Sequence, residues 1–138
     1  HDIALHFDTP TYWAAADEPS AESVAAKVTD ELGILGQLLD EELSTVSFHI
    51  PPSWVLDREF DSFTNTYAPL FFSEIDYRSD SSQKWTTGDP FPDGLADAFQ
   101  LLVHPGLWHP SHRPMADIVD DHRQEITHRV ERYFDLLG

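Results

Sequence analysis

Side chains suited to metal or acid–base chemistry lie where short apolar segments of this chain end. They are three histidines and two aspartates: His6, Asp8, His49, Asp80 and His104. Neutral imidazole and carboxylate groups bind divalent metals, and imidazole also exchanges protons near neutral pH. These residue types therefore predict a metal-assisted or acid–base site.

The apolar segments are typical of β-strands, and we predict strands at 3–7, 45–49, 75–78 and 99–103. In α/β folds the loops after parallel strands converge at one edge of the sheet, so active sites collect there. We therefore expect the five side chains at one rim. The last predicted strand is almost entirely apolar, which favours a strand buried on both faces.

Helices are predicted between and after these strands. Val24, Val28 and Leu32 recur at helical spacing behind Ser20, a suitable N-cap. A second helix is predicted behind Pro114, over the C-terminal segment. Strands alternating with helices indicate an α/β fold with a mostly parallel sheet.

The composition argues against several classes of partner. The chain has 138 residues, 25 of them Asp or Glu against 8 Lys or Arg, and a net charge of −17. Nucleic acids and anionic membranes bind basic faces, so neither is an expected partner. No cysteine is present, so a metal would need His, Asp or Glu ligands. This acidity is typical of salt-loving organisms, and an ordinary acidic cytosolic protein is the alternative.

The sequence also bears on location. It contains no apolar run of about 18 residues and no visible signal peptide. We therefore expect a cytoplasmic protein that does not contact a membrane. The chain begins at His1 and not at Met, so we expect residues upstream, and the oligomeric state is left open.

Four separated motifs together resemble one known family. They are His1–Asp8 (HDIALHFD), Ser47–Pro52 (SFHIPP), Tyr77–Ser81 (YRSDS) with Trp85, and Gln100–Pro105 (QLLVHP) with Trp108. In this order the motifs resemble the polysaccharide deacetylases, which are NodB-type, metal-dependent carbohydrate esterases. The resemblance is greatest to their divergent WbmS-like branch and covers residues 1–108.

The resemblance implies a fold and an activity. The fold would be a partial or distorted (β/α) barrel of the NodB type, formed by residues 1–138 as a single domain. The activity would be removal of acetyl groups from N-acetylated sugars or polysaccharide. The family's first strand, with its aspartate pair, would lie upstream of His1. Pro10 stands where typical members carry a second metal-binding histidine.

The resemblance also implies a divalent metal ion, with zinc the expected one. His6 matches the family's first metal histidine, and Asp8 projects to the same side of its strand and could supply a carboxylate ligand. His49 stands where the family often has arginine, and a histidine there could reach the same metal. Each residue also has a structural alternative. His6 could be a rim histidine bonded to a backbone carbonyl, and Asp8 could cap a loop. His49 could be a strand-end histidine fixed by the prolines that follow.

The remaining motifs imply catalytic and substrate-binding roles. Asp80 matches an aspartate that orients a catalytic group, and His104 matches the histidine that protonates the leaving amine. Trp85 and Trp108 could stack on sugar rings. The alternatives are that Asp80 is a plain turn residue and that His104 is a buried, hydrogen-bonded histidine at a strand end. At least one of the two tryptophans could pack in the core.

A second functional class stays open. The chain could be a non-catalytic module that keeps the deacetylase fold and binds carbohydrate or protein, or a fragment of an active enzyme. The sequence has no phosphate-binding glycine loop, nucleophile elbow or metalloprotease helix motif, which argues against NTPases, serine hydrolases and zincins.

Overall fold

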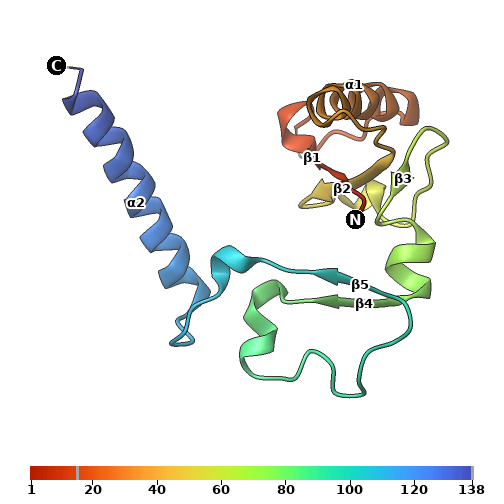
Figure 1. Cartoon of the computed structure of the whole chain (residues 1–138). Coiled ribbons are helices and arrows are strands. Elements are labelled where there is room, and N and C mark those ends of the chain that lie inside the picture. Colours follow the sequence, from red (N-terminus) through yellow and green to blue (C-terminus); the bar gives the residue numbers. More distant parts are fainter. Residues whose placement is uncertain (15, 138) are drawn as a thin grey trace. The chain divides into compact units, whose positions relative to one another are not determined.

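The computed structural model describes residues 1–14 and 16–137 of the chain. Its strands and long helices, in chain order, are β1 (Leu5–Asp8), α1 (Ala21–Leu39), β2 (Thr45–His49), β3 (Thr64–Asn65), β4 (Asp76–Ser79), β5 (Phe99–Leu102) and α2 (Met115–Asp135) (Figure 1). The chain divides into two compact units. The first contains residues 1–77 and 96–100, and the second contains 78–95 and the chain from 101 onward.

A parallel three-stranded sheet forms the framework of the first unit, in the order β1-β2-β3. The β1–β2 register runs from Leu5 opposite Val46 to Asp8 opposite His49. Helix α1 connects these two strands, as parallel neighbours require a crossover. Strand β3 lies outside the four predicted strands, and its two residues are too few for an apolar alternation to reveal it.

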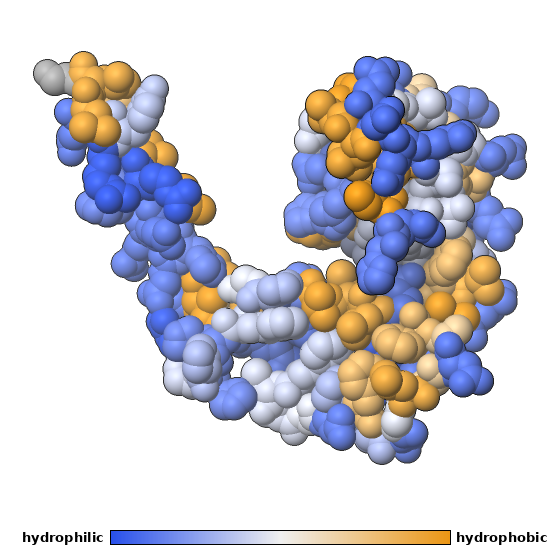
Figure 2. Space-filling model, viewed as in Figure 1, coloured by the Kyte–Doolittle hydropathy of each residue, from blue (hydrophilic) through white to orange (hydrophobic). Residues whose placement is uncertain are grey.

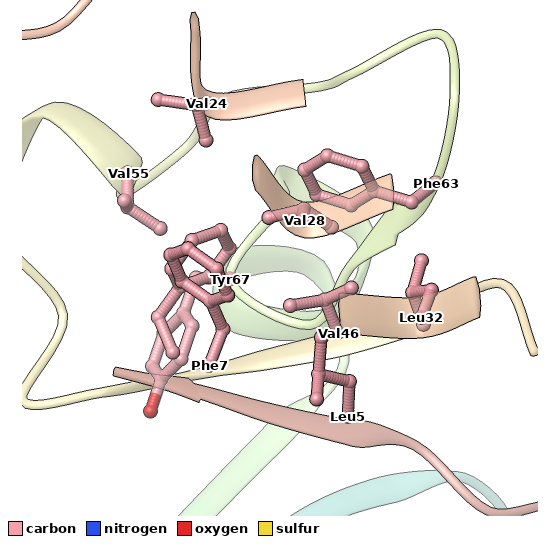
Figure 3. Packing of buried hydrophobic residues seen from close by; sticks show 10 residues of the cluster. Leu5, Phe7, Val24, Val28, Leu32, Val46, Val55, Phe63 and Tyr67 are labelled. Carbon is pink, nitrogen blue, oxygen red and sulfur yellow. The ribbon is translucent and has the colours of Figure 1, made fainter. Parts of the chain in front are cut away.

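The core of the first unit lies between this sheet and α1. Phe7, Val28, Val46 and Phe48 are fully buried. Figure 3 shows side chains from α1 and the two strands pointing toward one another. Because successive side chains of a strand point to opposite faces, the residues between these core positions face away from α1. His6 is one of them, so the alternation that builds the core also sets the side of the sheet on which His6 lies.

The ends of α1 follow from local chemistry. The Ser20 hydroxyl accepts a hydrogen bond from the Ser23 N–H at 3.2 Å, which confirms the predicted N-cap. At the other end the chain folds back on itself, and Glu41 N–H donates to the Gly36 carbonyl at 3.1 Å. A Cβ on Gly36 would lie 2.7 Å from the Glu41 carbonyl oxygen. This helix terminus therefore requires glycine at position 36.

The four predicted strands do not form one sheet. Strands β4 and β5 pair in a separate two-stranded sheet, and their arrows point the same way in Figure 1. The prediction that the last strand is buried on both faces is wrong, because Phe99 and Leu101 are 37% and 44% exposed. A strand with one neighbour in a two-stranded sheet lacks the surrounding layers that bury a central strand. The described residues thus form a mixed α/β structure with small parallel sheets and no closed barrel.

Helix α2 confirms the predicted C-terminal helix, although most of its apolar side chains are exposed. Figure 2 shows apolar residues along its surface. Ile118 is buried, and the His122 Nε2–H donates to the Gly106 carbonyl oxygen at 2.9 Å. No helix within residues 1–14 and 16–137 is long and apolar enough to cross a bilayer.

Charge is distributed unevenly between the two units. Of the 8 basic residues, only Lys27 and Arg58 belong to the first unit. Acidic residues occur in both units, with runs such as 40–42 in the first. The negative charge of the chain is therefore concentrated on the unit that carries the three-stranded sheet.

The core packing leads to a stability prediction. Replacing the fully buried Phe48 by alanine should lower the free energy of unfolding by about 3–5 kcal/mol, because it removes buried apolar surface and leaves a cavity. Leu38→Ala is the control, since Leu38 is 78% exposed, and should change it by less than about 0.5 kcal/mol. Urea denaturation measures both. Similar losses in the two variants would contradict this core.

Candidate functional site

Two clusters of the predicted site residues are present, one in each compact unit. In the first unit, His6 Nε2 and His49 Nδ1 lie 3.2 Å apart, and the rings meet edge to face at 5.3 Å between centroids. The strand register explains the contact. Asp8 is opposite His49, and His6, two residues before Asp8, shares its face of the sheet. Both histidines are exposed to solvent.

The spacing of the histidine pair fits two ligands of one metal ion. Around tetrahedral zinc with Zn–N bonds of about 2.0–2.1 Å, two nitrogen ligands are separated by roughly 3.3 Å. The observed 3.2 Å between the two imidazole nitrogens is close to this value. In the structure the two nitrogens are hydrogen-bonded to each other, and binding of an ion between them stays a prediction.

The third predicted ligand makes a different contact. The Thr11 hydroxyl donates to Asp8 Oδ2 at 2.8 Å, so the Asp8 carboxylate bonds a side chain in the turn after β1. Among residues 1–14 and 16–137, no group of three or more His, Asp or Glu side chains is arranged to hold a metal. Metal ligation by Asp8 stays a prediction.

The backbone beside the histidine pair is strained. Ile50 follows His49 directly and has φ of 43°, a left-handed conformation that a β-branched residue rarely adopts. Pro51 comes next and disfavours many conformations of the residue before it. Strain of this kind costs on the order of 1–3 kcal/mol and is found most often at functional sites.

In the second unit, the Asp80 carboxylate is the centre of a hydrogen-bonded cluster. It accepts from the His104 backbone N–H at 2.8 Å, from His104 Nδ1 at 2.6 Å and from Trp108 Nε1 at 2.7 Å. Asp80 is 4% exposed, whereas the His104 side chain is 42% exposed. A buried carboxylate thus holds an accessible imidazole.

The β4–β5 pairing brings these residues together. Asp80 follows the last residue of β4, and its N–H donates to the Leu102 carbonyl at the end of β5 at 3.2 Å. His104 comes two residues later, and the short 3₁₀ turn Pro105–Leu107 then leads to Trp108. Asp80 and His104 therefore lie together because the strands that precede them end side by side.

Electrostatics keep Asp80 ionised. Burial by itself raises the pKa of this carboxyl group, but the hydrogen bonds from His104 and Trp108 and the charge of His104 outweigh burial, so the pKa of Asp80 lies below its usual range. An ionised carboxylate only accepts hydrogen bonds, so His104 Nδ1 must carry the proton. Nε2, the other ring nitrogen of His104, is then the one left to contact a ligand.

A pocket of about 180 Å³ adjoins this cluster. Its lining includes Asp80, Trp85, Trp108, His109 and Arg113. Both tryptophans predicted to bind substrate therefore line one pocket. The sequence did not predict that Trp108 would also bond Asp80. It gave no role to Arg113, whose guanidinium pairs with Asp121.

The structure therefore brings together His6 with His49, and Asp80 with His104, Trp85 and Trp108. The first pair belongs to the first unit and the second group to the second unit. The contact between Asp80 and His104 could be anticipated from their motifs. The indole bond to Asp80 could not, because Trp108 carries no sequence signal that separates it from a core tryptophan.

The lowered pKa of Asp80 predicts a pH dependence. Its contribution to stability is present above the unfolded-state pKa of about 3.9 and is lost as the pH falls through the lower folded-state pKa. Asp80→Asn should therefore unfold more easily than wild type at pH 7, by roughly 1–3 kcal/mol. The difference should shrink in acid below about pH 4.

Urea denaturation across this pH range measures the effect, and Asp93→Asn is the control because Asp93 is exposed. A difference between Asp80→Asn and wild type that stays constant with pH would contradict the assignment of an ionised, bonded Asp80.

Comparison with known proteins adds no relative. No protein-family model matches the chain, and neither a curated protein nor a solved structure matches it significantly. The resemblance to polysaccharide deacetylases therefore depends on the four motifs alone. What this chain does has to be argued from the geometry of the two clusters.

Proposed function

We propose that this chain is a deacetylase-like hydrolase that removes acetyl groups from N-acetylated sugars or polysaccharide. One observation carries the proposal: the buried Asp80 carboxylate holds His104 by Nδ1 at 2.6 Å and leaves the imidazole accessible. An oriented imidazole of this kind is the usual group for transferring a proton to a leaving amine.

Each residue of the cluster has a distinct role in this reaction. Asp80 fixes the tautomer and orientation of His104, as a carboxylate does in other acid–base pairs. As water adds to the amide carbon, His104 takes up a proton of that water at Nε2 and gives it to the amine nitrogen when the C–N bond breaks, so that acetate and the free amine are formed. General acid–base catalysis of this type contributes about 10²–10⁴-fold to a rate.

His6 and His49 are the residues suited to hold the metal that the resemblance implies. Their nitrogens are 3.2 Å apart and both rings are accessible. A divalent ion held by His6 and His49 would supply Lewis-acid chemistry there. Zinc is the proposed ion, because imidazole nitrogen is among its preferred ligands.

The pocket beside Asp80 supports a carbohydrate substrate. Trp85 and Trp108 both line it, and Trp108 is 58% exposed. Aromatic side chains with one apolar face and one polar edge suit ligands that combine apolar and hydroxyl-bearing surfaces, as sugar rings do. We propose that these two residues contact the sugar.

A non-catalytic module is the second candidate function. The observation that favours it is the hydrogen bond from the Thr11 hydroxyl to Asp8 Oδ2, which holds this carboxylate at the turn after β1. In this case the tryptophan-lined pocket would bind carbohydrate without chemistry, or protein.

Replacing His104 tests the proposed reaction. In His104→Ala, release of acetate from N-acetylglucosamine oligomers should fall by about 10²–10⁴-fold, because the proton donor is lost. Bound metal should be unchanged. His128→Ala is the control, since His128 is exposed on α2. Acetate is measured by an enzymatic assay. No acetate release by wild type, or equal loss of metal and activity, would contradict the role of His104.

Metal content tests the histidine pair. Elemental analysis of protein purified without a histidine tag should find stoichiometric metal in wild type and in His128→Ala. The metal should be lost in His6→Ala and His49→Ala, because each removes one of two adjacent ligands. Wild-type protein without metal would overturn the metal role and favour the non-catalytic module.

A further inference from the structure

We propose that Gln83 is a positioning residue that holds Trp108 on the Asp80 carboxylate and thereby maintains the orientation of His104. The Gln83 side-chain amide donates two hydrogen bonds, to the Leu107 carbonyl at 3.3 Å and to the Arg113 carbonyl at 3.0 Å. The catalytic consequence rests on the proposed function, whereas the structural part stands independently of it.

The two accepting carbonyls span the segment that carries the indole. Leu107 directly precedes Trp108, and Arg113 lies five residues beyond it. A single NH₂ group supplies exactly the two donors needed, and the opposite orientation of the amide would set its oxygen against two carbonyl oxygens. Gln83 thus ties both ends of the 107–113 segment to one point.

The backbone of the same residue contacts the other half of the cluster. Gln83 N–H donates to the Asp80 carbonyl at 2.9 Å. Gln83 is therefore bonded both to the residue that carries the carboxylate and to the segment that carries its indole donor. The hydrogen bond from Trp108 Nε1 to Asp80 Oδ2, at 2.7 Å, closes this ring of contacts.

The backbone at Gln83 has an unfavourable conformation, which these hydrogen bonds must offset. Ser82 and Gln83 have φ of 58° and 56°, so two consecutive residues other than glycine are left-handed. Each such residue costs roughly 1–2 kcal/mol. A strained conformation persists only where its surroundings hold it in place. The two carbonyl bonds, the bond to Asp80 and the hydrogen bond that the Gln83 carbonyl accepts from the Thr86 hydroxyl at 2.8 Å hold it here.

Three substitutions separate the side-chain bonds from the backbone strain. Gln83→Leu keeps the approximate size and removes both donors. Gln83→Glu keeps the length and replaces the donors with an acceptor. Gln83→Asn favours the left-handed backbone but is one carbon too short to reach both carbonyls. Gln124→Leu, at an exposed position of α2, is the matched control.

The readout is the Trp108 indole N–H in a ¹H–¹⁵N NMR spectrum, with its hydrogen-exchange rate. In Gln83→Leu and Gln83→Glu this signal should shift and exchange faster, while the other three tryptophans and the circular dichroism stay as in wild type. In Gln83→Asn the Trp108 signal should also shift and exchange faster, although asparagine readily adopts the left-handed conformation at position 83. With an active wild type, kcat should fall by about 10²-fold with little change in KM, as expected for misplacement of a catalytic group.

An unchanged Trp108 signal in folded Gln83→Leu would overturn the proposal. So would a Gln83→Asn variant that matches wild type, because backbone conformation alone would then suffice. Should Gln83→Leu fail to fold, the Trp108 signal of Gln83→Asn still decides the question. A wild type without deacetylase activity would refute the proposed function and leave these NMR outcomes unaffected.

Discussion

The two-residue alternation of the β1–β2 pair is the constraint on which the first unit depends. It sends Phe7 and Phe48 into the core against α1 and sends His6 and His49 to the opposite side. A slip of one residue in the register would exchange the two faces, placing imidazoles in the core and phenyl rings in water. Burial of the core side chains sets the register of the two strands. That register places the two histidines in contact, although their contact does not itself stabilise the core.

The second unit is organised differently, around a charge removed from water. A buried carboxylate is tolerated only when hydrogen bonds replace its hydration. Asp80 obtains these bonds from a backbone N–H, an imidazole and an indole. The need to satisfy Asp80 therefore gathers the groups that could carry acid–base chemistry, and Gln83 holds the segment that supplies one of them. Hydrogen bonding to a buried carboxylate therefore organises the second unit, whereas apolar packing organises the first.

The sequence was informative where local signals determine structure. Helical spacing and Ser20 predicted α1, and apolar patterning predicted β2 with its observed bounds. The sequence was not informative where the structure depends on contacts between residues distant in sequence. The apolar run of β5 suggested a buried strand, but burial depends on how many layers surround a strand, and that is a tertiary property. Metal ligation by Asp8, expected because it projects to the same side of its strand as His6, stays a prediction, and in the structure its carboxylate accepts a hydrogen bond from the Thr11 hydroxyl. The NodB-type barrel and the zinc ion remain predictions.

The concentration of negative charge on the first unit has a consequence for ion capture. The histidine pair belongs to the unit in which Lys27 and Arg58 are the only basic residues. The summed field of that unit attracts a divalent cation before any ligand contact forms and raises its local concentration. This attraction extends over a Debye length, about 8 Å at physiological ionic strength and about 3 Å at 1 M salt. The attraction of this unit for divalent cations is therefore stronger in dilute solution than in concentrated brine.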